Sequence, residues 1–192
     1  MRLRGLNRWQ AEDLREDLAD LYVESCATAP GWEHRGREDF LHRLAGDVRH
    51  PGFAMLVAES PALVGCAFGF PVRRDGTWWR GFHGALPQNV EQLTTSGQVF
   101  AITGILVHPS ERDHGLTARL QQRLFTDHKA KLGATLVDQA NRTAFTAFRS
   151  WGWREIGEVH KPPGHAVLRA LVFPVGEPTA AKPGIPARRG TH

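Results

Sequence analysis

Apolar residues recur at helical spacing in two segments near the N-terminus. Between Arg8 and about Ala27, apolar side chains fall three or four residues apart and acidic residues occupy the opposite side. The segment from Glu38 to about Val48 repeats the pattern and stops before Pro51 and Gly52. The pattern therefore predicts two amphipathic helices, each packing one face on a core.

Two nearly continuous apolar runs follow these helices. They span Phe53–Glu59 and Ala62–Phe70, and Ser60-Pro61 separates them. Runs of this length predict the two strands of a hairpin, the first buried on both faces. Gly65 and Gly69 in the second run permit a bulge or the close approach of a ligand, or they simply pack against bulky neighbours.

The second half of the chain alternates strands and helices. A β-branched run ends at His108-Pro109, and leucines at helical spacing continue from Gly115 to about Lys131. The later predicted elements are a strand at Ala134–Val137, a helix from Asn141 to Gly152, and strands at Trp153–Val159 and Ala166–Phe173. This order predicts a mixed α/β domain around one largely antiparallel sheet, with a locally parallel strand-helix-strand crossover near the middle.

Residues 71–98 and 174–192 fall outside the regular pattern. A segment as long as 71–98 inside a compact domain is usually functional or disordered, and its tryptophans argue against disorder. We expect a lid-like insertion beside the functional site, or alternatively a contact surface of a homodimer. The Pro, Gly, Ala and Arg content of 174–192 predicts a flexible tail after a domain of residues 1–173.

Composition narrows the classes of function. The chain has 192 residues, 41% hydrophobic content and a net charge of +4, which suits one globular domain. Its arginines are scattered, so no nucleic-acid partner is signalled, and a phosphate-bearing ligand explains the positive surplus equally well. No apolar run approaches the roughly 20 residues of a membrane span, so we expect a cytoplasmic protein without a membrane partner.

The cysteines and histidines do not predict a metal site. Cys26 and Cys66 form no metal-ligand spacing, and two free thiols are favoured over a disulfide. His34, His42 and His50 share no helix face. We therefore expect no metal.

The clearest candidate chemistry lies between Ala101 and Leu124. A buried strand ends at His108-Pro109 and a helix begins near Gly115, so several backbone N–H groups come free at one place. Such a helix start binds anions, and phosphates in particular.

Two motifs in this half of the chain resemble the GNAT acetyltransferase superfamily. The family's phosphate-binding pattern, Arg/Gln-x-x-Gly-x-Gly/Ala after a strand ending in Val-x-Pro, is matched by Val107–Pro109 and Arg112–Thr117. Its later pattern, Asn-x-x-Ala-x-x-x-Tyr-x-x-x-Gly-Phe, is matched by Asn141, Ala144, Phe148, Gly152 and Trp153. The resemblance covers roughly residues 8–173. It implies a central sheet splayed at a V-shaped cleft, with helices on both faces.

The resemblance implies acetyl-CoA as the acetyl donor, and local physics agrees with that ligand. The pyrophosphate would lie on the helix start, with Arg112 or Arg119 adding a side-chain contact. Backbone groups of the preceding strand would pair with the pantetheine arm, and one amide would stabilise the oxyanion. The implied CoA-binding residues are Ile105, Leu106, Val107, Arg112, Asp113, His114, Gly115, Leu116, Thr117, Asn141 and Phe148.

The chain departs from the family's pattern at the positions that carry chemistry. Thr117 replaces a small residue, and Phe148 replaces the tyrosine that in many members protonates the departing thiolate. The strand positions where members often keep a carboxylate base hold Ala101, Thr103 and Gly104. An alkylammonium must lose a proton before it attacks, so the missing base is the larger deficit.

Four side chains are candidate bases acting through water, and each also has a structural interpretation. They are Glu59 at a strand end, His83 and Glu91 on a solvated loop, and His108 capping a turn.

We therefore expect an enzyme that transfers an acetyl group from acetyl-CoA to a primary amine of a small molecule. Residues 78–82 would shape an acceptor pocket suited to an apolar or planar group. One alternative is a catalytically degenerate domain that binds CoA or a partner protein. Another is an acyltransferase that uses a longer acyl-CoA or a carrier-protein donor. Acetylation of a protein N-terminus or lysine is also open.

Overall fold

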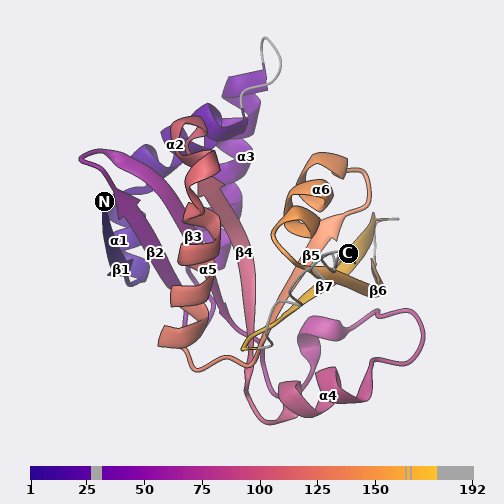
Figure 1. The fold of residues 1–192 in the computed structure, drawn as a ribbon. Coiled ribbons are helices and arrows are strands. Elements are labelled where there is room, and N and C mark those ends of the chain that lie inside the picture. The colour runs from indigo at the N-terminus through magenta and orange to yellow at the C-terminus, as the bar shows by residue number, and fades with distance from the viewer. Residues whose placement is uncertain (27–31, 163, 165, 177–192) are drawn as a thin grey trace, which may run out of the picture.

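The computed structural model describes residues 1–26, 32–162, 164 and 166–176, and Figure 1 shows its fold. In these residues one sheet holds the strands in the order β1-β2-β3-β4-β5-β7-β6. The strands are β1 (Arg2–Leu6), β2 (Ala54–Glu59), β3 (Leu63–Pro71), β4 (Val99–Val107), β5 (Leu132–Asp138), β6 (Arg154–Lys161) and β7 (Ala166–Pro174). The α-helices are α1 (Arg8–Asp13), α2 (Arg15–Cys26), α3 (Trp32–Asp47), α4 (Gln88–Thr95), α5 (Leu116–Asp127) and α6 (Arg142–Ser150). Two 3-10 helices are η1 (Thr77–Trp79) and η2 (Pro109–His114).

The sheet is mixed and mostly antiparallel, as the sequence predicts. Neighbouring strands from β1 to β4 pair antiparallel, and so do β5 with β7 and β7 with β6. The parallel pair is β4 with β5, which are joined by α5. A parallel pair needs a crossover connection, and the leucines of α5 bury that crossover against the sheet.

Helices cover both faces of the sheet. The first face carries α5 and α6, whose apolar residues pack with Phe100, Ile102 and Trp153. The second face carries α1, α2 and α3 over strands β1 to β4. Residues 71–98 fill the remainder of this second face, because Val72, Trp79 and Val90 are buried with residues of β5, β6 and β7.

The N-terminal elements differ from the prediction in three respects. The sequence leaves a strand before Arg8 undefined, and the structure has β1 there; a short edge strand with alternating arginines gives little apolar signal. The predicted first helix is two helices, and α1 begins after a reciprocal capping pair in which Asn7 and Gln10 each accept a backbone N–H at 3.0 Å. Helix α3 begins at Trp32, ahead of the predicted start. The predicted end near Ala27 lies outside the described residues.

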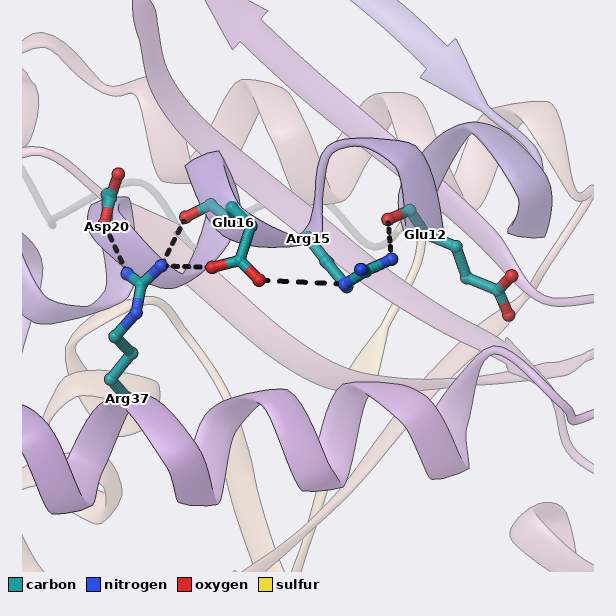
Figure 2. A network of polar contacts seen from close by, with 5 residues as sticks. All are labelled: Glu12, Arg15, Glu16, Asp20 and Arg37. Atoms are coloured by element: carbon teal, nitrogen blue, oxygen red, sulfur yellow. Dashed lines mark hydrogen bonds and ion pairs between the residues drawn. The ribbon is translucent and has the colours of Figure 1, made fainter.

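An ion-pair network ties α3 to α2 (Figure 2). The guanidinium of Arg37 on α3 pairs with the carboxylates of Glu16 and Asp20 on α2. Glu16 also lies 3.7 Å from Nε of Arg15, whose Nη1 donates to the carbonyl of Glu12. The network therefore links the exposed sides of α2 and α3, while apolar residues of both helices pack on the sheet.

The segment 71–98 contains η1 and the amphipathic helix α4, which the sequence did not predict. The indole Nε1 of Trp79 donates to Thr94 Oγ1 at 3.0 Å, joining η1 to α4. Phe82 forms an isolated antiparallel bridge with Val159, so the segment is anchored on edge strand β6. Most of the predicted tail, residues 177–192, lies outside the described residues.

Candidate active site

Strands β4 and β5 separate after a short stretch of pairing. Their register runs from Val99 with Leu132 to Ala101 with Ala134, and beyond it β4 stays with β3 while β5 stays with β7. Figure 1 shows the two strands diverging in this direction. The backbone edge of Ile105–Val107 that faces β5 is therefore not paired with it. This is the V-shaped splay that the resemblance implies.

A β-bulge lies on β4 just above the last paired residues. Phe68 pairs with Gly104 and Gly69 with Ile102, so Thr103 is the extra residue. A Cβ on Gly69 would lie 1.8 Å from the carbonyl oxygen of Ala101, which means that the bulge requires glycine there. Of the interpretations left open for Gly69, the bulge is the one that the structure supports.

The predicted anion site lies at the open end of the splay. η2 ends at Gly115, whose φ of +66° turns the chain into α5. No side chain caps the start of α5, and a Cβ on Gly115 would have nothing within 4 Å. The first amides of α5 thus have no side-chain cap and lie next to the exposed Gly115, as an anion site requires. The side chains of Asp113 and His114 lie outside the described residues.

Arg112 and His108 join this turn to the end of α2. Arg112 donates through Nη2 to the carbonyl of Ser25. His108 accepts from the amide of Ser110 through Nδ1, and its Nε2 lies 3.5 Å from Glu24. His108 therefore caps the turn, as its structural interpretation predicts.

The second motif forms the facing wall on α6. Asn141 caps this helix by accepting from the amide of Ala144 at 3.1 Å, which confirms the predicted cap. Phe148 packs edge-on against Trp151 and Trp153, with ring centroids 5.3 Å away in each case. No residue of α6 is fully buried, although Phe145 and Phe148 contact the core. An apolar surface is thus left partly uncovered on the helix that carries this motif.

The remaining predicted base candidates lie away from the splay. Glu59 is on β2 and pairs with Arg4 at 2.8 Å, and this hydrogen bond lowers its pKa. His83 stacks on His160 of β6 at 5.4 Å. Glu91 is exposed on α4. The structure brings none of these three to β4 or β5.

A carboxylate that the sequence did not single out does face the bulge. Asp47 ends α3, and its half-buried carboxyl lies opposite the hydroxyl of Thr103. Burial raises the pKa of Asp47, while the Thr103 hydroxyl and the charges of His50 and Arg43 oppose that rise. Asp47 is the last residue of a helix and has exposed residues close to it on both sides in the sequence, so no local pattern distinguishes it from an ordinary surface carboxylate.

Aromatic rings extend this site toward residues 71–98. The ring of His50 stacks on Phe70 with centroids 3.9 Å apart, and Trp78 lies edge-on to Phe70 at 5.9 Å. We call Asp47, His50, Phe70, Trp78 and Thr103 the bulge cluster. The indole Nε1 of Trp78 is buried without a hydrogen-bond partner among the described residues.

Comparison with known proteins places the chain in a family. The sequence model of the acetyltransferase (GNAT) family matches residues 11–153. The chain belongs to this family. A search of curated protein sequences found no match. The family uses acetyl-CoA, and its members acetylate amines.

Solved structures share the fold at low sequence identity. An aminoglycoside 6'-N-acetyltransferase complexed with coenzyme A is 12% identical with a TM-score of 0.53, over 93% of this chain and 100% of that one. A ribosomal-protein-S18-alanine N-acetyltransferase from Escherichia coli is 11% identical with a TM-score of 0.50, over 93% and 96%. A spermidine N-acetyltransferase chimera from Vibrio cholerae is 12% identical with a TM-score of 0.51, over 90% and 94%. These likenesses support the fold.

The described residues contain neither a metal-binding group nor a membrane-spanning helix. No group of three or more His, Cys, Asp or Glu side chains in this part of the chain is arranged to hold a metal ion. Among the same residues, no helix is both long enough and apolar enough to cross a membrane. Cys26 and Cys66 are free thiols, as predicted, and Cys66 is buried in β3.

Proposed function

We propose that this protein transfers an acetyl group from acetyl-CoA to a primary amine of a small molecule, by direct attack of the amine on the thioester. One observation carries the proposal. β4 leaves β5 after Ala101, and its unpaired edge then leads toward the uncapped start of α5. A strand edge with unpaired backbone groups and a helix start with free amides together suit a ligand that joins a diphosphate to an amide-bearing arm.

The length of β4 suits the pantetheine arm. A strand rises about 3.3 Å per residue, so the backbone from Val107 to Thr103 spans about 13 Å. In the proposed complex the diphosphate lies on the amides of Arg112–Thr117 and the arm pairs with Ile105–Val107. The thioester then reaches the bulge at Thr103. Asn141 and Phe148 line the arm from the α6 side.

In this proposal the side chains of the turn make different contacts with the donor. Arg112 is engaged with Ser25, so we assign it to positioning the turn as well as to the electrostatic attraction of the diphosphate. Arg119 lies one turn along α5 and is exposed, which suits a direct phosphate contact. Thr117 is half-buried in the first turn of α5, where its hydroxyl can donate to a phosphate oxygen.

Loss of the family's tyrosine at Phe148 is compatible with this reaction. A free thiol has a pKa near about 8.5, so a thiolate leaves without an acid far more readily than an alkoxide would. Alignment of amine and thioester in one site also supplies a large part of the rate enhancement.

A second function is favoured by one specific observation. Phe148 cannot donate a proton, and β4 carries no carboxylate at Ala101, Thr103 or Gly104. A domain that binds CoA without turnover would have these features. A longer acyl-CoA or a carrier-protein donor would use the same splay.

Calorimetry and thiol release test the proposal together. We expect acetyl-CoA to bind, and thiol to appear when a panel of primary amines is added. Acetyl-CoA binding without thiol release across the panel would support the degenerate domain. Faster thiol release from a longer acyl-CoA would identify that acyl-CoA as the donor. Absence of acetyl-CoA binding would overturn the proposal.

A further inference from the structure

We propose that Asp47 is the catalytic base of this enzyme, accepting the proton of the acceptor amine at the β4 bulge. This inference rests on the proposed function and names the group that β4 itself lacks. It follows from where the end of α3 meets the splayed strand.

The position of Thr103 locates the reacting centre. Thr103 is the bulged residue, one residue beyond Ile102 and two beyond the last β4 residue that pairs with β5. Its neighbours alternate between the two faces of the sheet: Ile102 packs with α5 and Leu106 packs with the helices of the second face. A Cβ on Gly104 would lie 2.2 Å from the ring of Phe68, a member of the second-face core. Gly104, next to the bulge, therefore faces the side of the sheet that carries α3.

The bulge cluster has the composition of a ligand site. Trp78 Nε1 is a buried polar atom without a hydrogen-bond partner among the described residues, although such atoms are nearly always paired in folded proteins. A polar atom of a bound acceptor would satisfy it. The ring of Phe70 lies edge-on to Trp78 and stacks on His50, and these rings suit an apolar or planar group.

The surroundings of Asp47 suit proton transfer. The groups that act on its carboxyl are Arg43 and His50 from α3 and Thr103 from β4. Burial is the largest of these effects and raises the pKa of Asp47, which brings the carboxyl closer to the operating range of a base. Phe40 and Leu44 of α3 are buried in the same core as Leu106 of β4, so the helix that carries Asp47 is packed against this part of the sheet.

The proton and electron balance is complete without another reactant. The ammonium of the acceptor releases one proton to solvent by way of the Asp47 carboxylate. The nitrogen lone pair of the neutral amine forms a bond to the thioester carbon, and a second proton passes from nitrogen to Asp47. The carbon–sulfur bond then breaks, its electron pair leaves on sulfur, and the thiolate takes up the proton held by Asp47. The products are the amide, the free thiol and one proton in solvent.

The test compares Asp47→Asn with the matched control Asp39→Asn. Both aspartates lie on α3, and Asp39 is exposed and remote from β4. The probe amine is phenethylamine, measured for binding to the protein–CoA complex and for thiol release from acetyl-CoA between pH 6 and 9. Since burial disfavours the charged form of Asp47, Asp47→Asn is expected to unfold at a temperature no lower than the wild type.

For Asp47→Asn we expect kcat/KM for phenethylamine to fall about 100-fold or more, the usual contribution of a base. Acetyl-CoA affinity stays unchanged, and Asp47→Glu recovers part of the rate. Asp39→Asn matches the wild type in every measurement.

Two results overturn the assignment. One is an Asp47→Asn variant with an unchanged kcat/KM. The other is an Asp39→Asn variant that loses as much activity as Asp47→Asn, which would show a general effect of changes on α3. Failure of the proposed function is a different outcome, because it appears in the wild type, as loss of acetyl-CoA binding or as binding without thiol release across the amine panel.

Discussion

The hydroxyl of Thr135 donates a hydrogen bond of 2.8 Å to the carbonyl of Ile102, at the point where β4 and β5 separate. Thr135 is the first residue of β5 beyond its pairing with β4, and Ile102 immediately precedes the bulge. A side chain thus replaces the backbone bond that the splay removes, and it keeps a buried carbonyl satisfied.

Replacing Thr135 by valine should destabilise the protein at the apex of the splay. The side chains are similar in size, but the carbonyl of Ile102 loses its donor, and an unpaired buried polar group costs about 1–3 kcal/mol. Denaturant unfolding measures the change. Thr126→Val, at an exposed position of α5, is the control and should be close to neutral. Equal stability of the two variants would show that the bond contributes nothing.

Replacing Gly115 by valine should weaken acetyl-CoA binding at least 10-fold in calorimetry. The variant must hold a β-branched residue at a φ of +66°, which strains the turn and shifts the first amides of α5. Gly84→Val is matched, because Gly84 has a φ of +89° and open space around its Cβ position, but it lies in the 71–98 segment. Both variants should lose similar stability. An unchanged acetyl-CoA affinity in Gly115→Val would contradict the assignment of the diphosphate to this turn.

Substitutions at Gln121 and Trp153 should have coupled effects on the free energy of unfolding in a double-mutant cycle. Gln121 on α5 is buried and accepts from the indole Nε1 of Trp153 at 3.1 Å, which joins the two halves of the splayed sheet. Gln121→Leu should cost about 1–3 kcal/mol because the indole N–H loses its acceptor. Adding Trp153→Phe should then cost less than it does alone. Gln122→Leu, at the adjacent exposed position, serves as the control, and strict additivity would contradict the coupling.

Glu59→Gln should leave acetyl transfer unchanged, since Glu59 lies on β2 and pairs with Arg4. The pair lowers the pKa of Glu59, so its contribution to stability is present above the carboxyl's unfolded pKa of about 4.3 and is lost as the pH falls through the lower folded value. Any stability difference between wild type and Glu59→Gln at neutral pH should therefore shrink in acid. A large loss of kcat in this variant would restore Glu59 as a base candidate.

Thiol titration should separate the two cysteines. Burial in β3 raises the pKa of Cys66 to about 12, so almost no thiolate is present at pH 8. Cys26 is only half-buried; burial raises its pKa, and the charges of Arg112 and Arg43 oppose that rise. We expect Cys26 to react first in the folded protein and Cys66 to react only on unfolding. A Cys26→Ser variant that still reacts rapidly would contradict the buried state of Cys66.

The sequence was sufficient to predict a structural feature where one short segment contains all of the residues that form it. The turn at Gly115 and the cap at Asn141 both lie where the motifs predict them, because capping and positive φ depend on neighbouring residues. The alternation of strands and helices likewise specified the parallel pair of β4 and β5, because a strand-helix-strand unit closes in one way. Short or weakly apolar elements were missed, among them β1 and α4, because their pattern is too brief to stand out.

The position of Asp47 depends on contacts that no local pattern contains. The sequence determined the turn on which we propose that the donor's phosphates bind, since adjacent residues build that turn, and it showed that β4 carries no carboxylate at Ala101, Thr103 or Gly104. Whether a carboxylate reaches β4 from elsewhere depended on how α3 packs across the sheet. That packing comes from apolar residues of α3, and it brings Asp47 opposite Thr103, a residue 56 positions later in the chain. Long-range packing of this kind assembles the proposed base side of the site, whereas local backbone geometry assembles the proposed donor side.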